Sequence, residues 1–248
     1  MVPGMDHSDR APAFRLDHVA VGVWRGPEAT PFLVGELGGR RHIAGPGMGF
    51  RFWQYRYAGG GLLELLEPDG PPGGFLHRFL ERRGPGVHHV TFKVPNLRAA
   101  MQRARERGYE VVNANEEFPG WKEAFLHPRQ AQGIVVQLAE SEGGEPPGLW
   151  AFPPEPPAGE AVALVGLRLS ARDAGRARHQ WQDLLSGDCE ARDRELVFRW
   201  PESPLQIRVA IDAAAPEGPR GLEIRSPRPL ALPEGPHPVL GACFLSAP

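Results

Sequence analysis

Two short segments of the chain alternate apolar and polar residues in the same order. Residues 16–23 read LDHVAVGV and residues 87–94 read VHHVTFKV, each with His third, Val fourth and Val last. Apolar side chains at every second position predict a strand with one buried face. Two further segments also match each other, LLELLE at 62–67 and VVQLAE at 135–140. The two pairs recur at offsets of 71 and 73 residues, which indicates an internal repeat.

Each repeat contains the same order of expected elements. A helix is expected at 28–37 in the first repeat and at 97–107 in the second, where Asn96 can cap the N-terminus and Gly108 the C-terminus. Further short strands follow each helix, including 49–57, 61–66, 123–127 and 134–139. The repeat unit is therefore strand, helix and then strands, βαβββ.

The second half of the chain is predicted to contain a degenerate copy of the two βαβββ units. A strand, a helix capped by Asp173 and two further strands make a third unit over 161–212, and a truncated fourth unit begins at Gly221. Where the first pair carries its histidines, this half carries Gly166 and Gly221, so we expect it to hold no metal and to have a structural, interface or lid role. The predicted fold is α+β, with paired βαβββ modules forming curled mixed sheets around a cleft and a second, degenerate module pair.

Strand alternation places one polar residue of each matched segment on the face turned away from the helices. These residues are His18, Glu64, His89 and Gln137. Pairing of the two units by pseudo-twofold symmetry would bring them together as ligands of one divalent ion: Zn, Mn, Co, Ni or Fe. Taken alone, each of these residues is typical of a polar side chain in the core or on the surface whose hydrogen bonds are satisfied. Only their recurrence at one offset favours a metal site. The same alternation predicts that His88 points to the opposite face.

Composition sets the boundaries and the class of protein. Glycine and proline, 31 and 28 of 248 residues, gather in segments that indicate a flexible tail at 1–13, a two-module domain at 14–140, a linker at 141–160 and degenerate modules at 161–248. Mixed charge with a net value of −2 argues against a nucleic-acid or membrane-surface protein, and no apolar run is long enough to span a membrane. Two cysteines and no apolar leader predict a reduced, cytoplasmic protein.

At these residues the chain resembles the vicinal oxygen chelate superfamily, which includes glyoxalase I, methylmalonyl-CoA epimerase, extradiol dioxygenases and bleomycin-resistance proteins. The likeness covers 14–140 and is greatest to the epimerases, through LDHVAVGV, LLELLEP, GVHHVTFKVPNL and FLHPRQAQGIVVQL. It implies a metal-binding domain with one divalent ion on His18, Glu64, His89 and Gln137. Epimerases and glyoxalases usually carry a glutamate where Gln137 stands, and a neutral amide cannot accept a proton at pH 7. The resemblance therefore leaves Glu64 as the catalytic group that moves a proton.

The resemblance implies a metal-dependent isomerase or lyase that chelates oxygens of a small substrate and stabilises an enolate. Aromatic residues near the matched segments are candidates for the wall of the substrate pocket: Phe52, Trp53, Phe118, Trp121 and Phe125. Two alternatives stay open, an Fe(II)-dependent extradiol dioxygenase and a non-catalytic small-molecule binding or resistance protein. The expected partner is a small-molecule substrate, not a nucleic acid or a membrane, and a homodimer is the candidate assembly.

Overall fold

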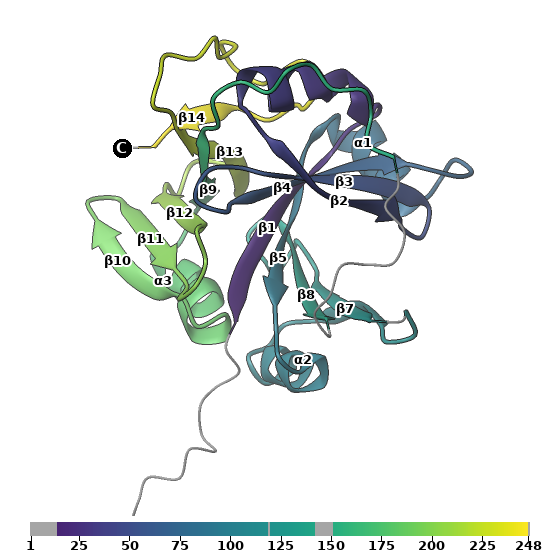
Figure 1. Ribbon diagram of the computed structural model, residues 1–248. Coiled ribbons are helices and arrows are strands. Elements are labelled where there is room, and N and C mark those ends of the chain that lie inside the picture. Colours follow the sequence, from purple (N-terminus) through teal and green to yellow (C-terminus); the bar gives the residue numbers. More distant parts are fainter. Residues whose placement is uncertain (1–13, 119, 142–150, 248) are drawn as a thin grey trace, which may run out of the picture.

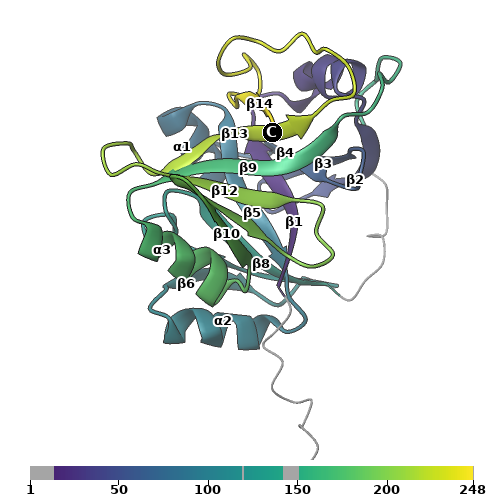
Figure 2. The same cartoon turned by 90° about the vertical axis from the view of Figure 1, so that its left-hand side faces the viewer.

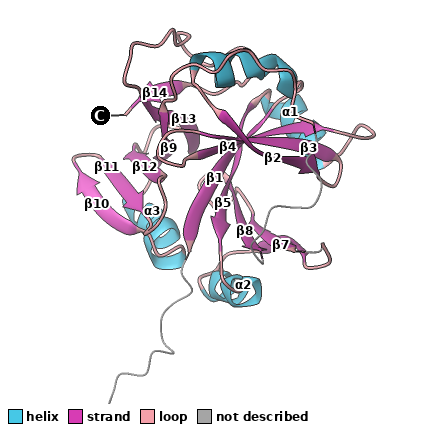
Figure 3. Cartoon of the chain, viewed as in Figure 1, coloured by secondary structure: helices cyan, strands magenta, loops and turns pink. Residues whose placement is uncertain are grey.

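Two mixed β-sheets dominate the molecule, and the helices lie at its periphery (Figure 3). The computed structural model describes residues 14–118, 120–141 and 151–247, so the expected tail at 1–13 and residues 142–150 of the expected linker lie outside the described residues. No helix within these ranges is long and apolar enough to cross a membrane.

The first sheet contains the first two units, with its strands in the order β2-β3-β4-β1-β5-β8-β7-β6. The first unit comprises β1 (Arg15–Gly22), η2 (Gly26–Ala29), η3 (Pro31–Glu36), β2 (Arg40–Pro46), β3 (Phe50–Arg56) and β4 (Leu62–Pro68). After the connecting helix α1 (Phe75–Arg83), the second unit comprises β5 (Gly86–Lys93), α2 (Leu97–Glu106), β6 (Val111–Asn115), β7 (Trp121–Leu126) and β8 (Val135–Ser141). β1 and β5 pair antiparallel at the centre, and each pairs in parallel with the last strand of its own unit.

The second sheet repeats this order as β10-β11-β12-β9-β13-β14. Its third unit comprises β9 (Ala163–Ala171), α3 (Ala174–Arg178), η4 (His179–Leu184), β10 (Asp188–Arg192), β11 (Glu195–Arg199) and β12 (Gln206–Ile211). The fourth unit retains only β13 (Gly218–Arg225) and β14 (Phe244–Ser246). The proline-rich segment 226–243 between these two strands forms no helix, because proline lacks the N–H that a helical ladder needs.

The α+β class and the paired βαβββ modules are confirmed, with two differences from the prediction. The expected helix at 28–37 is divided into η2 and η3, because Pro31 cannot donate the hydrogen bond that would continue one helix. Neither sheet closes: the first ends at β2 and β6, and the second at β10 and β14.

One hydrophobic core joins the two sheets. Val19 of β1 and Leu167 of β9 both lie in it, and Phe92 of β5 packs edge-on against Trp200 with ring centroids 4.9 Å apart. The helices α2 and α3 lie side by side along this junction (Figures 1 and 2). Because strand residues alternate, the other face of each sheet is turned away from the shared core.

The close approach of β9 to β12 requires glycine at position 166. A Cβ atom on Gly166 would lie 1.9 Å from the carbonyl oxygen of Gln206. We expect Gly166→Ala to lower the free energy of unfolding by at least about 2 kcal/mol, because the two strands must separate. The control is Gly86→Ala in β5, where the nearest non-adjacent atom would be 3.8 Å away. Urea unfolding measures both, and equal losses would contradict the steric argument.

Candidate metal centre

Two β-bulges set the direction of the side chains at the centre of the first sheet. Asp17 and His88 are extra residues in the β1–β5 ladder, and each precedes a predicted ligand. A bulge bends the strand and re-aims its side chains, so neighbouring residues can meet. Asp17 Oδ2 lies 2.9 Å from His18 Nδ1, and His88 Nδ1 lies 2.9 Å from His89 Nδ1. The expectation that His88 points away from His89 is therefore wrong, because the bulge interrupts the alternation.

Three of the predicted ligands meet inside the first sheet, carried by β1, β4 and β5. One nitrogen each from His18 and His89 and one carboxylate oxygen of Glu64 all lie within 4.8 Å of one another. Glu64 Oε1 is 3.7 Å from His18 Nε2 and 3.9 Å from His89 Nε2. All three side chains are buried. The repeat thus brings these residues together as expected, in a buried cluster.

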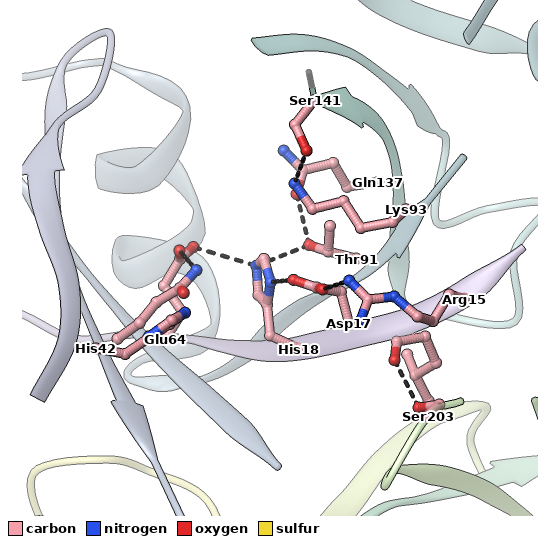
Figure 4. A network of polar contacts seen from close by, with 12 residues as sticks. Arg15, Asp17, His18, His42, Glu64, Thr91, Lys93, Gln137, Ser141 and Ser203 are labelled. Atoms are coloured by element: carbon pink, nitrogen blue, oxygen red, sulfur yellow. Dashed lines mark hydrogen bonds and ion pairs between the residues drawn. The ribbon is translucent and has the colours of Figure 1, made fainter. Parts of the chain in front are cut away.

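Gln137 joins the cluster through Thr91, its cross-strand partner in the β5–β8 ladder. The Thr91 hydroxyl donates to Gln137 Oε1 at 2.5 Å and lies 2.9 Å from His18 Nε2 (Figure 4). Because its proton is used on Gln137, the hydroxyl oxygen accepts from His18. Gln137 Nε2 donates to Glu123 Oε2 at 2.6 Å, which fixes the amide with its oxygen toward Thr91.

The two imidazoles differ in protonation. Burial lowers the pKa of His18, but the charge of Glu64 and hydrogen bonds to Asp17 and Glu64 outweigh burial and raise that pKa to about 9. Burial, together with the neighbouring His88 and His18, holds the pKa of His89 well below its usual value. In the metal-free protein His18 is therefore a cation near pH 7, whereas His89 is neutral.

The donor set fits a divalent metal ion. His89 Nε2 is buried and has no hydrogen-bond partner. Asp17 accepts from the outer ring nitrogen of His18, which is the arrangement that orients metal-binding imidazoles in proteins. Gln54 Nε2 donates to Glu64 Oε2 at 2.7 Å, so Oε1 is the oxygen left near the histidines. Two imidazoles and a carboxylate suit Zn, Mn, Fe, Co or Ni.

The two predicted aromatic residues of β3 point in opposite directions. Phe52 lies on the face that carries Gln54 and Glu64, and it packs beside α1. Trp53 lies on the other face, 5% exposed within the shared hydrophobic core. The structure therefore brings Phe52 to the side of the cluster and places Trp53 away from it.

The predicted aromatic residues of the second unit lie around β7. Phe125 is opposite Gln137 in the β7–β8 ladder, so the two side chains share a face. Trp121 is half-buried, and its Nε1 donates to Glu123 Oε2 at 2.9 Å. Phe118 precedes the strand and is 54% exposed. The structure brings Trp121 and Phe125 to the Gln137 side of the site and leaves Phe118 on the surface.

Helix α1 covers part of the face that carries the cluster. Its leucines pack on Ala20 of β1, which shares this face with His18. The rings of Phe75 and Phe79 approach His88, with centroids 5.5 Å and 4.8 Å away. This helix lies outside the matched segments of the repeat, so the repeat did not predict its place.

Sequence reasoning also missed Asp17, Glu123 and Lys93. Asp17 gave no signal, because alternation predicts the opposite face and the bulge is not visible in the sequence. Glu123 could have been found, since it alternates with Trp121 and Phe125. Lys93 Nζ lies 3.6 Å from the Trp121 ring centroid, and burial lowers the pKa of this lysine to about 8.

Comparison with known sequences agrees with the resemblance seen in the motifs. Residues 17–125 match the model of the Glyoxalase/Bleomycin resistance protein/Dioxygenase superfamily. The uncharacterized protein YqjC of Bacillus subtilis is 31% identical over 143 residues, which are 53% of this chain and 95% of YqjC. The mitochondrial methylmalonyl-CoA epimerase of Mus musculus is 29% identical over 136 residues, 51% of this chain and 73% of the epimerase.

Solved structures with a similar arrangement also cover about half of the chain. A hypothetical protein from Bacillus halodurans has a TM-score of 0.49 and 27% identity over 54% of this chain and 98% of its own. Methylmalonyl-CoA epimerase from Mycobacterium tuberculosis has a TM-score of 0.48 and 25% identity over 52% of this chain and 89% of its own.

The protonation of His18 can be measured directly. In metal-free protein kept with a chelator, we expect NMR titration to give His18 a pKa of about 9, because Glu64 and Asp17 stabilise the imidazolium. Asp17→Asn removes one of these carboxylates and should lower that pKa. A His18 pKa near 6.5 in the parent would contradict the described network.

Proposed function

Because the chain belongs to the glyoxalase/bleomycin resistance protein/dioxygenase superfamily, we propose that it is a metal-dependent isomerase or lyase of the glyoxalase and epimerase type. Its reaction stabilises an enolate formed from a small substrate. The observation that carries this proposal is the meeting of two imidazoles and one carboxylate in a buried cluster, with a carboxamide held beside them by Thr91.

Four side chains would hold the ion: His18, His89, Glu64 and Gln137. When bound, a divalent ion supplies Lewis-acid stabilisation of negative charge on the substrate oxygens. Hydrogen bonds to the Nδ1 atoms of the two histidines orient their rings, so that each Nε2 atom faces the site. His18 Nδ1 donates to a carboxylate, and when His89 Nδ1 donates to His88 its Nε2 keeps the lone pair that ligation needs.

Glu64 and Glu123 are the carboxylates available for proton transfer. Epimerisation at a carbon next to a carbonyl needs a proton acceptor on one face of that carbon and a donor on the other. Glu64 belongs to the cluster itself, at β4. Glu123 at β7 lies beyond Gln137, on the second-unit side, and is hydrogen-bonded to it at 2.6 Å. We assign the first proton transfer to Glu64 and the second to Glu123, which supplies the carboxylate that residue 137 lacks.

The surroundings favour a substrate with both an apolar and an anionic part. Phe52 on the first-unit side and Trp121 and Phe125 on the second-unit side supply apolar surface on the face of the sheet that carries the cluster. Lys93 adds a cation over the Trp121 ring. Two curated relatives are named as epimerases of CoA thioesters, of Mus musculus and of Cereibacter sphaeroides. A 2-substituted malonyl or related acyl thioester is therefore the substrate class we propose.

Metal analysis tests the ligand set. We expect about one divalent ion per chain in protein purified without added metal, and His89→Ala should lower metal affinity at least tenfold, because loss of a ligand should match or exceed loss of an outer partner. His179→Ala, at an exposed position, is the matched control. Full metal content in His89→Ala would contradict the assignment. Iron in the site, with O2 uptake on catechols, would select a ring-cleaving dioxygenase instead.

Deuterium exchange tests the chemistry. In D2O we expect the parent to exchange the α-proton of methylmalonyl-CoA. Glu64→Gln and Glu123→Gln should each slow exchange by roughly 10²-fold or more, because Glu64 accepts the α-proton and Glu123 delivers the deuteron that replaces it. Glu116→Gln, a surface carboxylate paired with Arg98, is the control. Metal content is measured on every variant, so that a loss of the ion is separated from a loss of the base. Equal exchange rates in parent and Glu123→Gln would remove Glu123 from the mechanism.

A further inference from the structure

Lys93 stands on the same face of the first sheet as the metal centre, beyond Thr91 on β5. The pairing of β5 with β8 is regular over residues 89–93, so residues two positions apart on this strand share a face. Thr91 contacts two of the predicted metal ligands, and Lys93 lies about 7 Å further along the strand (Figure 4). The charge of Glu64 also acts on the pKa of Lys93, so the ammonium group is within electrostatic range of the cluster.

Two uncharged side chains hold the ammonium group of Lys93. Its Nζ donates to Ser141 Oγ at 3.0 Å and lies 3.6 Å from the centroid of the Trp121 ring. Ser141 and Trp121 are cross-strand partners in the β7–β8 ladder, and Gln137 lies on the same face four residues before Ser141. An ammonium group has three N–H donors, of which Ser141 takes one. Lys93 is partly exposed, so a ligand can reach a donor that neither neighbour uses.

Among the described residues, no carboxylate forms an ion pair with Lys93. Asp17 is the carboxylate that acts most strongly on its pKa, but both oxygens of Asp17 have other partners. Oδ1 accepts from Arg15 at 2.8 Å, and Oδ2 lies 2.9 Å from His18 Nδ1. Lys93 is therefore a partly buried cation that the described residues leave without a counter-ion, beside a centre built to bind a substrate.

We propose that Lys93 binds a free carboxylate on the acyl group of the substrate, and that this contact selects dicarboxylic acyl thioesters over neutral ones. The inference rests on the proposed function, because it assigns one part of that thioester substrate to Lys93. A hydrogen bond from an ammonium group to a carboxylate is stronger than one between neutral groups. The carboxylate of a malonyl group is attached to the reacting carbon, whereas the phosphates of coenzyme A are a whole pantetheine arm away. The position of Lys93 near the cluster therefore favours the carboxylate.

Calorimetric titration of the chain with malonyl-CoA and acetyl-CoA tests the proposal, because these two thioesters differ by one carboxylate. We expect the parent to bind malonyl-CoA at least tenfold more tightly than acetyl-CoA. Lys93→Gln should weaken the binding of malonyl-CoA about tenfold and change that of acetyl-CoA less than twofold, since it removes the charge that pairs with the carboxylate. Lys93→Arg keeps the positive charge and should keep the preference.

The chain has only one other lysine, Lys122, which provides the matched control. Lys122 follows Trp121 on β7 but lies on the other face of the sheet, where its Nζ is 2.7 Å from Glu140 Oε1. Lys122→Gln should therefore leave the preference for malonyl-CoA unchanged.

With two lysines, the contact can also be observed in the parent, which decides the matter if Lys93→Gln unfolds. After reductive ¹³C-methylation of the lysines, malonyl-CoA should shift the NMR signal of Lys93, assigned with Lys93→Arg, and acetyl-CoA should not. A Lys93 signal that does not respond to malonyl-CoA would overturn the proposal.

The titrations separate this proposal from its alternatives. Equal binding of the two thioesters by the parent, or an undiminished preference in Lys93→Gln, would overturn it. Equal weakening of both thioesters in Lys93→Gln would assign the lysine to a phosphate of coenzyme A and remove it from the acyl carboxylate. A parent that prefers malonyl-CoA through Lys93 yet exchanges no α-proton in D2O would contradict the proposed reaction and leave this assignment intact.

Discussion

The antiparallel pairing at the centre of each sheet is the constraint on which the rest of the molecule depends. Two extra residues in the β1–β5 ladder re-aim the side chains that follow them, and the β9–β13 ladder has extra residues at the same two places. Each sheet therefore brings equivalent positions of its two units close together. These positions are buried in both sheets. The polar side chains that occupy them must therefore find their hydrogen-bond and charge partners among one another.

The two sheets meet this requirement in different ways. In the first, His18, His89 and Glu64 leave one ring nitrogen without a partner, which suits an ion that accepts lone pairs. In the second, Arg208 and Glu223 neutralise each other directly. Glycine replaces each histidine for a steric reason: a Cβ atom on Gly166 would meet the β12 backbone at 1.9 Å, and one on Gly221 would meet the carbonyl oxygen of Cys243 at 2.9 Å. The same backbone arrangement thus carries a set of residues suited to bind a cation in the first sheet and the guanidinium group of Arg208 in the second.

Much of this could be predicted from the repeat in the sequence. The 71-residue offset and the strand alternation predicted the module order and the meeting of His18 with His89, because both depend on periodicity alone. Periodicity could not predict the bulges, so Asp17 and His88 were given the wrong face or overlooked. Trp53 was named as a pocket residue from its type, although its position in the alternation with Phe52 already indicates the opposite face. The Arg208 network needed the register of β9 with β12, which no single segment contains.

Helix α1 breaks the symmetry between the two sheets. The chain passes from β4 to β5 through this helix, whereas only residues 212–217 connect β12 to β13. Phe75 and Phe79 of α1 therefore pack against His88 beside the first polar cluster, whereas in the described part of the chain no helix joins the corresponding strands β12 and β13 of the second sheet. Shielding from water lowers the local dielectric constant and strengthens every charge interaction beneath the helix. The side chains of the first cluster are accordingly buried, whereas Arg168 and Glu195 of the second polar network are each about a third exposed.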